Sequence, residues 1–222
     1  MNSKAAVLEA HPIIVLETIV DRYGGELDLT FSRYKVGPPG DQERRSRATF
    51  EIKARRATRA WLKNELRDLG QDDELALHSC LSLGGLRFHF FMIDYQLDCS
   101  LPVVRNLGVG ILAETRFAPP VSAQRPPQLY TFETGRCYHQ YADLLMPEPA
   151  WHRYLGSLLL LTPACQTPVV DVRWIGHALR RGYAALRWSH NTKRYLSMPK
   201  LVDRSATVTY QTALGSAQDD SE

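Results

Sequence analysis

A long apolar and aromatic run at residues 86–97 constrains the fold of this chain more than any other segment. Such a run is typical of a central strand, both of whose faces are covered by other elements. The chain has 222 residues, of which 44% are hydrophobic, so it can bury a sizeable core without disulfides or metals. This length suits one domain, or two small fused lobes, built around that strand.

The same composition argues against three classes of protein. The apolar run at residues 158–161 is far shorter than the roughly 20 residues that span a bilayer. The four cysteines (Cys80, Cys99, Cys137 and Cys165) are widely spaced and form no CxxC pair, which disfavours a disulfide scaffold or a zinc finger. The first residues show no cleavable signal pattern. We therefore expect a cytoplasmic protein that does not bind a membrane.

Helical and strand patterns alternate along the chain without repeats. Helices are predicted at 13–23, 57–69, 74–83, 149–161 and 174–181. Strands are predicted at 26–36, 86–97, 129–133, 138–142, 169–173, 185–189 and near Tyr195. This alternation indicates an α+β or α/β fold.

Basic residues gather in two blocks, although the formal net charge is only +3. Residues 43–67 hold nine basic and three acidic side chains, and residues 171–204 hold eight basic and two acidic ones. Aromatic residues lie among the basic residues of the second block. A polyanionic partner is the functional interpretation of both blocks, and a solvated helix face is the alternative for the first.

The first candidate site lies at the end of the apolar run. Asp94 and Asp98 are an even number of residues apart, so an extended chain would place them on one face. Two carboxylates on one face can hold Mg²⁺ or Mn²⁺, which prefer oxygen ligands. The alternative is that Asp94 forms a turn or a cap.

The second candidate site is the sequence TGRCYH at residues 134–139, between two predicted strands. A glycine turn exposes backbone N–H groups, and Arg136 can make bidentate contacts to a phosphate. His139 can donate a further hydrogen bond to a triphosphate oxygen. The alternative is that His139 is a structural histidine.

The third candidate site begins at Asp171, which follows two valines. An arginine-rich helix, and then Arg187 on a predicted strand, come after it. Asp171 is either a further carboxylate of the same site or the N-cap of the helix that follows.

In this order, the three segments resemble the catalytic core of the archaeo-eukaryotic primase superfamily, the primase-polymerases. That family has a hydrophobic strand ending in Asp-x-Asp, then a Ser-Gly-x-Arg-Gly-x-His turn. Its third motif is an apolar residue and Asp, followed by a helix and an Arg-x-x-x-Ser-Leu-like segment. Residues 134–139 resemble the second motif, and Asp171 with the segment 185–189 resembles the third. The resemblance covers roughly residues 86–195.

The resemblance implies an α+β fold: a primase-polymerase-like core with an RRM-like antiparallel sheet flanked by helices, plus an N-terminal α/β lobe. The lobe, with its basic helix, would take residues 1–70, and the core would take residues 71–210. Residues 211–222 are polar and acidic and are expected to form a disordered tail.

The resemblance also implies a function, the template-dependent joining of nucleotides on single-stranded or primed DNA in DNA replication. Two Mg²⁺ or Mn²⁺ ions would be held by Asp94, Asp98 and Asp171. The incoming NTP or dNTP would be bound by Arg136, His139, Arg187 and Ser189. Nucleic acid would be contacted by Arg55, Arg56, Arg59, Lys193 and Arg194, with Trp188 or Tyr195 stacking on a base.

One position departs from the family pattern, because the second acid of Asp-x-Asp is Gln96, a neutral amide. A second hypothesis is therefore a catalytically degenerate subunit that binds nucleotide or nucleic acid in a larger complex, with a helicase or other subunits as partners. A third is a metal-dependent nuclease that uses Asp94, Asp98 and a base such as His89 or Lys53.

Overall fold

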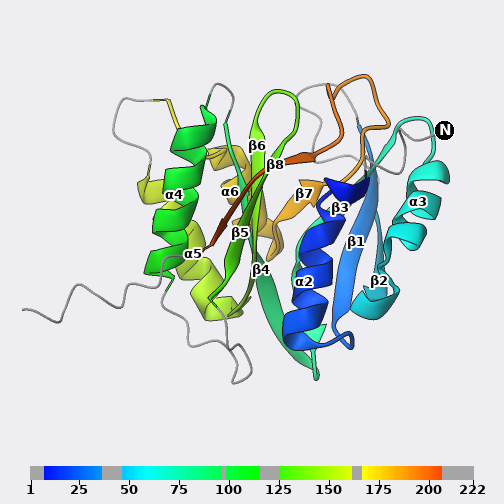
Figure 1. Cartoon of the computed structure of the whole chain (residues 1–222), viewed down its shortest axis with the longest axis horizontal. Helices are drawn as coiled ribbons and strands as arrows, with labels where there is room; N and C mark the ends of the chain where they lie inside the picture. Colours follow the sequence, from blue (N-terminus) through cyan, green and yellow to red (C-terminus); the bar gives the residue numbers. More distant parts are fainter. Residues whose placement is uncertain (1–7, 37–46, 97–98, 116–125, 162–166, 207–222) are drawn as a thin grey trace, which may run out of the picture.

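The structure is a computed structural model that describes residues 8–36, 47–96, 99–115, 126–161 and 167–206. In these ranges eight strands form one antiparallel sheet (Figure 1). Neighbouring strands follow the order β2-β1-β3-β4-β6-β5-β8, and β7 pairs with β3 beside this path. The strands are β1 (Asp28–Lys35), β2 (Arg47–Lys53), β3 (Asp73–Leu83), β4 (Leu86–Asp94), β5 (Gln128–Glu133), β6 (Tyr138–Pro147), β7 (Ala185–Arg187) and β8 (Lys200–Ala206).

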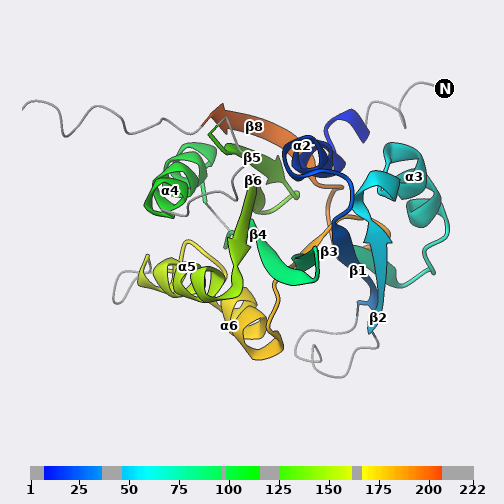
Figure 2. The same ribbon diagram turned by 90° about the horizontal axis from the view of Figure 1, so that it is seen from below.

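Helices cover both sides of this sheet. They are α2 (Ile13–Tyr23), α3 (Arg59–Arg67), α4 (Leu101–Glu114), α5 (Glu148–Leu160) and α6 (Val172–Arg181), with a 3-10 turn, η1 (Ala54–Arg56), before α3. Figure 2 shows the sheet curling around α2, with α4 and α5 on the outer side of the curl. The expected α+β fold, an antiparallel sheet flanked by helices, is therefore confirmed.

β4 is the central strand that the apolar run predicts. It lies between β3 and β6, and Phe90, Phe91, Met92 and Ile93 are at most 2% exposed. The Tyr154 hydroxyl of α5 donates a hydrogen bond of 2.8 Å to the carbonyl of Met92, so the helix is held to the strand by more than apolar contact. The strand ends at Asp94, where burial becomes partial.

The helix predicted at residues 74–83 is wrong, because this segment is β3 and pairs with β1, β4 and β7. Leu75, Leu77 and Leu81 lie at odd positions and are at most 3% exposed, so they share one face of the strand. This period of two is present in the sequence. It is interrupted by Ser79, which occupies the next odd position and obscures the pattern.

Three shorter segments also differ from expectation. Residues 169–173 form no strand, because Val170 makes only an isolated bridge with Tyr95 and α6 begins at Val172. The strand expected near Tyr195 lies later in the chain, as β8, and β2 was not expected at all. β2 is an edge strand without a buried residue, so its apolar pattern is weak.

The domain boundary that was expected at residue 70 would divide one continuous sheet. β1 and β2, from the expected N-terminal lobe, pair with each other, and β1 also pairs with β3. The expected tail at residues 211–222 lies outside the described residues. Among the residues that are described, no helix has the length and apolar character needed to cross a membrane.

Trp188 anchors the end of β7 in the core. Its side chain is fully buried and meets the ring of Phe31 edge-on, with 5.3 Å between the ring centroids. Its Nε1 donates a hydrogen bond to the Tyr141 hydroxyl at 3.1 Å, and His11 Nε2 donates one to its carbonyl at 2.7 Å. No ring face is left for a nucleotide base, so Trp188 is a core residue where stacking was expected.

Truncation of this side chain tests its core role. We expect Trp188→Ala to lower the free energy of unfolding by about 3–5 kcal/mol, because it removes a large buried ring and its hydrogen bond. Trp188→Phe keeps most of the packing and should cost clearly less. Urea unfolding followed by circular dichroism measures both, and equal stability of wild type and Trp188→Ala would contradict the core assignment.

Candidate functional site

A pair of backbone hydrogen bonds brings two distant carboxylates together at the end of β4. The Asp171 N–H donates to the carbonyl of Asp94 at 2.9 Å, and the Gln96 N–H donates to the carbonyl of Val169 at 2.8 Å. Between them, Tyr95 and Val170 form the isolated bridge. The first and third sequence motifs therefore lie side by side.

Asp171 is the N-cap of α6. Its Oδ1 accepts hydrogen bonds from the backbone N–H groups of Arg173 at 2.8 Å and Trp174 at 3.2 Å. The capping alternative for Asp171 is thus confirmed, and it does not exclude a role in the site. The cap fixes the side chain at the helix N-terminus, where the helix dipole stabilises a negative charge.

His139 faces Asp94 across the β4–β6 pair. The two residues are in register, and His139 Nε2 lies 3.5 Å from Asp94 Oδ1, with side chains 7% and 23% exposed. Burial lowers the pKa of His139 to about 3, and the charge of Arg187 acts in the same direction. His139 is therefore neutral at neutral pH and leaves the carboxylate without a cationic partner from this side.

The environment of Asp94 disfavours its charged form. Burial, and to a smaller extent the carboxylate of Asp171, raise the pKa of Asp94 to about 8, against the opposing charge of Arg187. Two carboxylates held together without a neutralising cation are typical of sites that bind one.

The second motif forms a tight turn between β5 and β6. The Thr134 N–H and hydroxyl donate hydrogen bonds of 2.9 Å and 3.0 Å to the carbonyl of Cys137. Gly135 has φ of 99°, and a Cβ there would lie 2.7 Å from Leu196 Cβ, so the turn requires glycine. The Arg136 side chain is exposed at the tip of this turn.

Arg187 of β7 connects the turn to the loop at residues 189–197. Its guanidinium donates hydrogen bonds to the carbonyls of Ser189, Ser197 at 3.1 Å and Thr134 at 3.5 Å. It also lies over the ring of Tyr195, 4.1 Å from the centroid. A buried guanidinium with neutral acceptors keeps its full positive charge, which acts on Asp94 and His139.

One cavity of about 760 Å³ unites the three motifs. Of the residues predicted for the site, it is lined by Asp94, Arg136, His139, Asp171, Arg187, Arg194 and Tyr195. Gln96 lines it as well, and so do three arginines that were not predicted: Arg47, Arg173 and Arg181. Six arginines thus face two carboxylates, which gives the cavity a positive potential suited to a polyanion such as a triphosphate.

A family model described as archaeo-eukaryotic primase 1D-like matches residues 53–200, which is more than half of the 222 residues. This chain belongs to the archaeo-eukaryotic primase-like family. The family that the three motifs resemble is therefore confirmed, and with it a primase-related function in general terms. Neither the curated proteins nor the solved structures include a significant match.

A buried carboxylate that the sequence analysis missed holds the loop of this primase-like site. Glu74, at the start of β3, is fully buried. It accepts hydrogen bonds from the Ser189 hydroxyl, from the Asn191 N–H at 3.0 Å, and from the Thr192 N–H and hydroxyl, both at 2.8 Å. Ser189 is thus occupied by this anchor and does not line the cavity, where nucleotide binding was expected.

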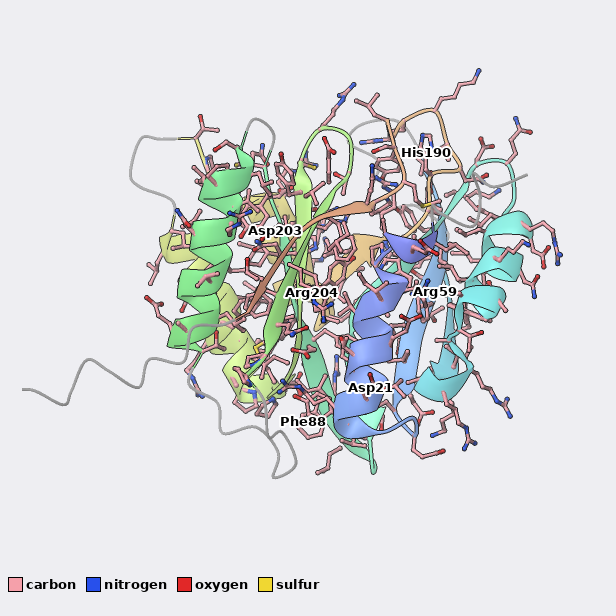
Figure 3. The ribbon with its side chains drawn as sticks, in the orientation of Figure 1. Asp21, Arg59, Phe88, His190, Asp203 and Arg204 are labelled. Atoms are coloured by element: carbon pink, nitrogen blue, oxygen red, sulfur yellow. The ribbon has the colours of Figure 1, made fainter. Side chains whose placement is uncertain are left out.

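The loop that Glu74 anchors carries Lys193 and Arg194, two basic residues that were predicted to contact nucleic acid. Figure 3 labels His190 on this loop, whose Nε2 donates a hydrogen bond of 2.8 Å to the carbonyl of Tyr195. Arg194 and Tyr195 line the cavity, whereas Lys193 is exposed outside it. By anchoring this loop, Glu74 positions both Arg194 and Tyr195 in the lining of the cavity.

Three arginines of the first basic block, Arg55, Arg56 and Arg59, lie outside the cavity, and two of them are neutralised by ion pairs. Arg59 pairs with Glu17 at 2.7 Å, beside α2 and α3 (Figure 3), and Arg55 pairs with Glu26. Arg56 is exposed, and none of these three arginines lines the cavity. Solvent-exposed ion pairs weaken the positive field that a template strand would meet at this surface.

Among the described residues, Asp94 and Asp171 are the two carboxylates that line the cavity. No group of three His, Cys, Asp or Glu side chains placed to hold a metal occurs in the described part of the chain, and Asp98 lies outside that part. Mg²⁺ is commonly bound through one or two carboxylates, with waters and substrate phosphates completing its shell. The repulsion between Asp94 and Asp171 is what such an ion would relieve.

The raised pKa of Asp94 predicts a pH dependence of stability. A carboxyl whose folded-state pKa exceeds its unfolded value stabilises the fold at low pH, and this contribution is lost as the pH rises through the folded pKa of about 8. Between about pH 7 and pH 9, where unfolded histidines are already neutral, wild type should lose about 1 kcal/mol more than Asp94→Asn. Urea unfolding at several pH values measures this difference, and identical profiles would contradict it.

Glu74 gives a second prediction. We expect Glu74→Gln to lower the free energy of unfolding by about 2–4 kcal/mol, because several hydrogen bonds to a buried charge are lost or weakened. Limited proteolysis should then cut within residues 189–197, which the wild type protects. Glu51→Gln, at an exposed position of β2, is the matched control and should change neither result.

Proposed function

We propose that this chain is a metal-dependent nucleotidyltransferase of the primase-polymerase kind, which joins nucleotides on single-stranded or primed DNA. One observation carries the proposal: the carboxylates Asp94 and Asp171 share a single cavity with the glycine turn of Arg136 and with Arg187. Carboxylates that hold a cation and arginines that bind phosphates are the two parts that nucleotidyl transfer requires.

Each residue has a distinct task in this proposal. Asp94 and Asp171 would hold Mg²⁺ or Mn²⁺, which neutralises charge on the phosphates when bound, and Asp98 would add a ligand for a second ion. Arg136, exposed on its turn, would bind the triphosphate. Arg187, fixed by three carbonyls, would stabilise negative charge developing on the phosphates without having to move.

Neutral His139 supports the same arrangement. A protonated imidazole 3.5 Å from Asp94 would compete with a cation for the carboxylate. Because burial and Arg187 lower the pKa of His139 to about 3, the imidazole is neutral at neutral pH and does not compete with a metal ion for Asp94.

A second candidate function has a specific observation in its favour. Gln96 lines the cavity at the position of the family's second acid, so two carboxylates line it within the described chain. On this alternative the site binds a nucleotide or nucleic acid without joining nucleotides, as a subunit of a larger complex. The third hypothesis, a nuclease, finds less support: His89 stacks on Trp151 in the core, Lys53 pairs with Asp28, and neither lines the cavity.

The decisive experiment is nucleotide incorporation with and without a primer. Purified protein is incubated with single-stranded DNA, labelled NTPs or dNTPs, and Mg²⁺ or Mn²⁺. We expect product from wild type and at least about a 100-fold loss in Asp94→Asn and in Asp171→Asn, because several kcal/mol of charge stabilisation depend on the carboxylates. Asparagine is chosen at 171 because it preserves the helix cap.

The control is Asp203→Asn on β8, which changes a carboxylate paired with Arg105 outside the cavity. It should retain wild-type incorporation. Absence of product from wild type, together with tight binding of nucleotide or DNA, would favour the degenerate subunit. Shortened DNA in the absence of nucleotides would overturn both primase hypotheses.

A further inference from the structure

Four side chains from separate elements converge on a wall of the cavity that the sequence motifs do not include. Arg47 begins β2, and its Nη1 lies 3.5 Å from Nε2 of His78 on β3. The ring of His78 stacks on Tyr183, with 4.2 Å between centroids and 11° between planes. Arg47 and Tyr183 line the cavity together with Arg181 at the end of α6, whereas His78 is buried behind them.

This wall carries positive charge that no described carboxylate neutralises. Burial lowers the pKa of Arg47, the interaction with Tyr183 opposes this shift, and the nearby charge of Arg181 lowers the pKa further. His78 contributes no negative charge, because burial together with Arg47 and Arg181 lowers its pKa to about 3 and keeps it neutral. The carboxylates of the described chain form no ion pair with Arg47 or Arg181. Elsewhere on the molecule, by contrast, Arg33, Arg55 and Arg59 all have acidic partners.

The like charges of Arg47 and Arg181 interact unfavourably, and the partial burial of Arg47 increases the cost. An anion between them would relieve both effects. Phosphate matches guanidinium geometry through bidentate hydrogen bonds. The tyrosines support the same ligand class, because Arg47 lies over the ring of Tyr34 at 5.0 Å, and arginines interleaved with aromatic rings are typical of single-stranded nucleic acid grooves.

The position of this wall relative to the carboxylates follows from the geometry of α6. Asp171, Trp174, His177 and Arg181 all line the cavity at spacings of three or four residues, so they form one stripe along the helix. A rise of 1.5 Å per residue places Arg181 about 15 Å along the axis from Asp171. The wall therefore lies at the opposite end of the helix from the carboxylates.

We propose that Arg47 and Arg181, backed by His78 and Tyr183, form a second phosphate-binding subsite, separate from the one at Arg136 and Arg187. It would bind a phosphate of a second nucleotide unit. That unit is either part of a nucleic acid strand that runs along α6 or a second free nucleotide. The subsite requires the cavity and its charge, but it does not require the nucleotidyl transfer proposed above.

Salt dependence of binding tests the subsite directly. The affinity of a short labelled oligothymidylate is measured at several salt concentrations for wild type, Arg47→Gln, Arg181→Gln and the double variant. For a single strand, each lost phosphate contact should reduce the slope of log affinity against log salt by about 0.7, and the double variant by about 1.4. In parallel, calorimetry with a non-hydrolysable nucleoside triphosphate counts the nucleotides bound per chain.

The two arms distinguish the source of the phosphate. A reduced salt slope with unchanged nucleotide binding supports the subsite and assigns it to a strand. A fall from two bound nucleotides to one in the double variant supports the subsite and assigns it to a second nucleotide. No change in either arm, for variants whose thermal unfolding matches wild type, overturns the proposal.

Two controls separate this result from other causes. Arg67→Gln removes an exposed guanidinium that pairs with Asp68 outside the cavity. An equal loss of slope in this variant would mean that only net charge matters, and would overturn the proposal. Asp94→Asn should abolish incorporation and keep the wild-type slope, so failure of the proposed enzyme function and failure of the subsite give different results.

Discussion

The backbone connection between Asp94 and Asp171 is the interaction on which the site depends. Two hydrogen bonds and one bridge hold the end of β4 against the start of α6, although the two carboxylates are far apart in the chain. Neither carboxylate would be placed this way by its own side chain, because like charges repel. The sheet and the helix cap supply the free energy that holds them together, and the raised pKa of Asp94 reflects first its burial and then the charge of Asp171.

Two other side chains of the cavity, His139 and Arg187, form no ion pair that would neutralise Asp94. His139, which could have neutralised Asp94, is kept uncharged by burial and by Arg187. Arg187 itself is held by backbone carbonyls and not by a carboxylate, so its charge remains directed at the cavity. A site with unneutralised acids at one end and surplus arginines elsewhere is electrostatically incomplete. A metal ion with a polyphosphate would complete it, because that ligand carries both signs of charge.

Local pattern was enough to predict the parts of this fold that are buried and regular. The apolar run predicted β4, and the motifs at residues 134–139 and at Asp171 predicted several of the residues that line the cavity. What the sequence could not supply was register between distant strands. Arg47 and Arg181 belonged to the two basic blocks but were not predicted as site residues, and Glu74 was not singled out, because their positions depend on how β3, β2 and α6 pack together. β3 itself was mistaken for a helix, since Ser79 interrupts its alternation of leucines.

The segment from Arg187 to Ser189 explains why site and core are inseparable in this molecule. Successive side chains of an extended segment point to opposite faces, so Arg187 faces the cavity while Trp188 enters the core. Ser189 then binds Glu74, which anchors the loop carrying Arg194 and Tyr195. A strand as short as β7 has too few ladder hydrogen bonds to fix its own register. The buried ring of Trp188 fixes it instead, and the position of a cavity arginine is therefore determined by core packing.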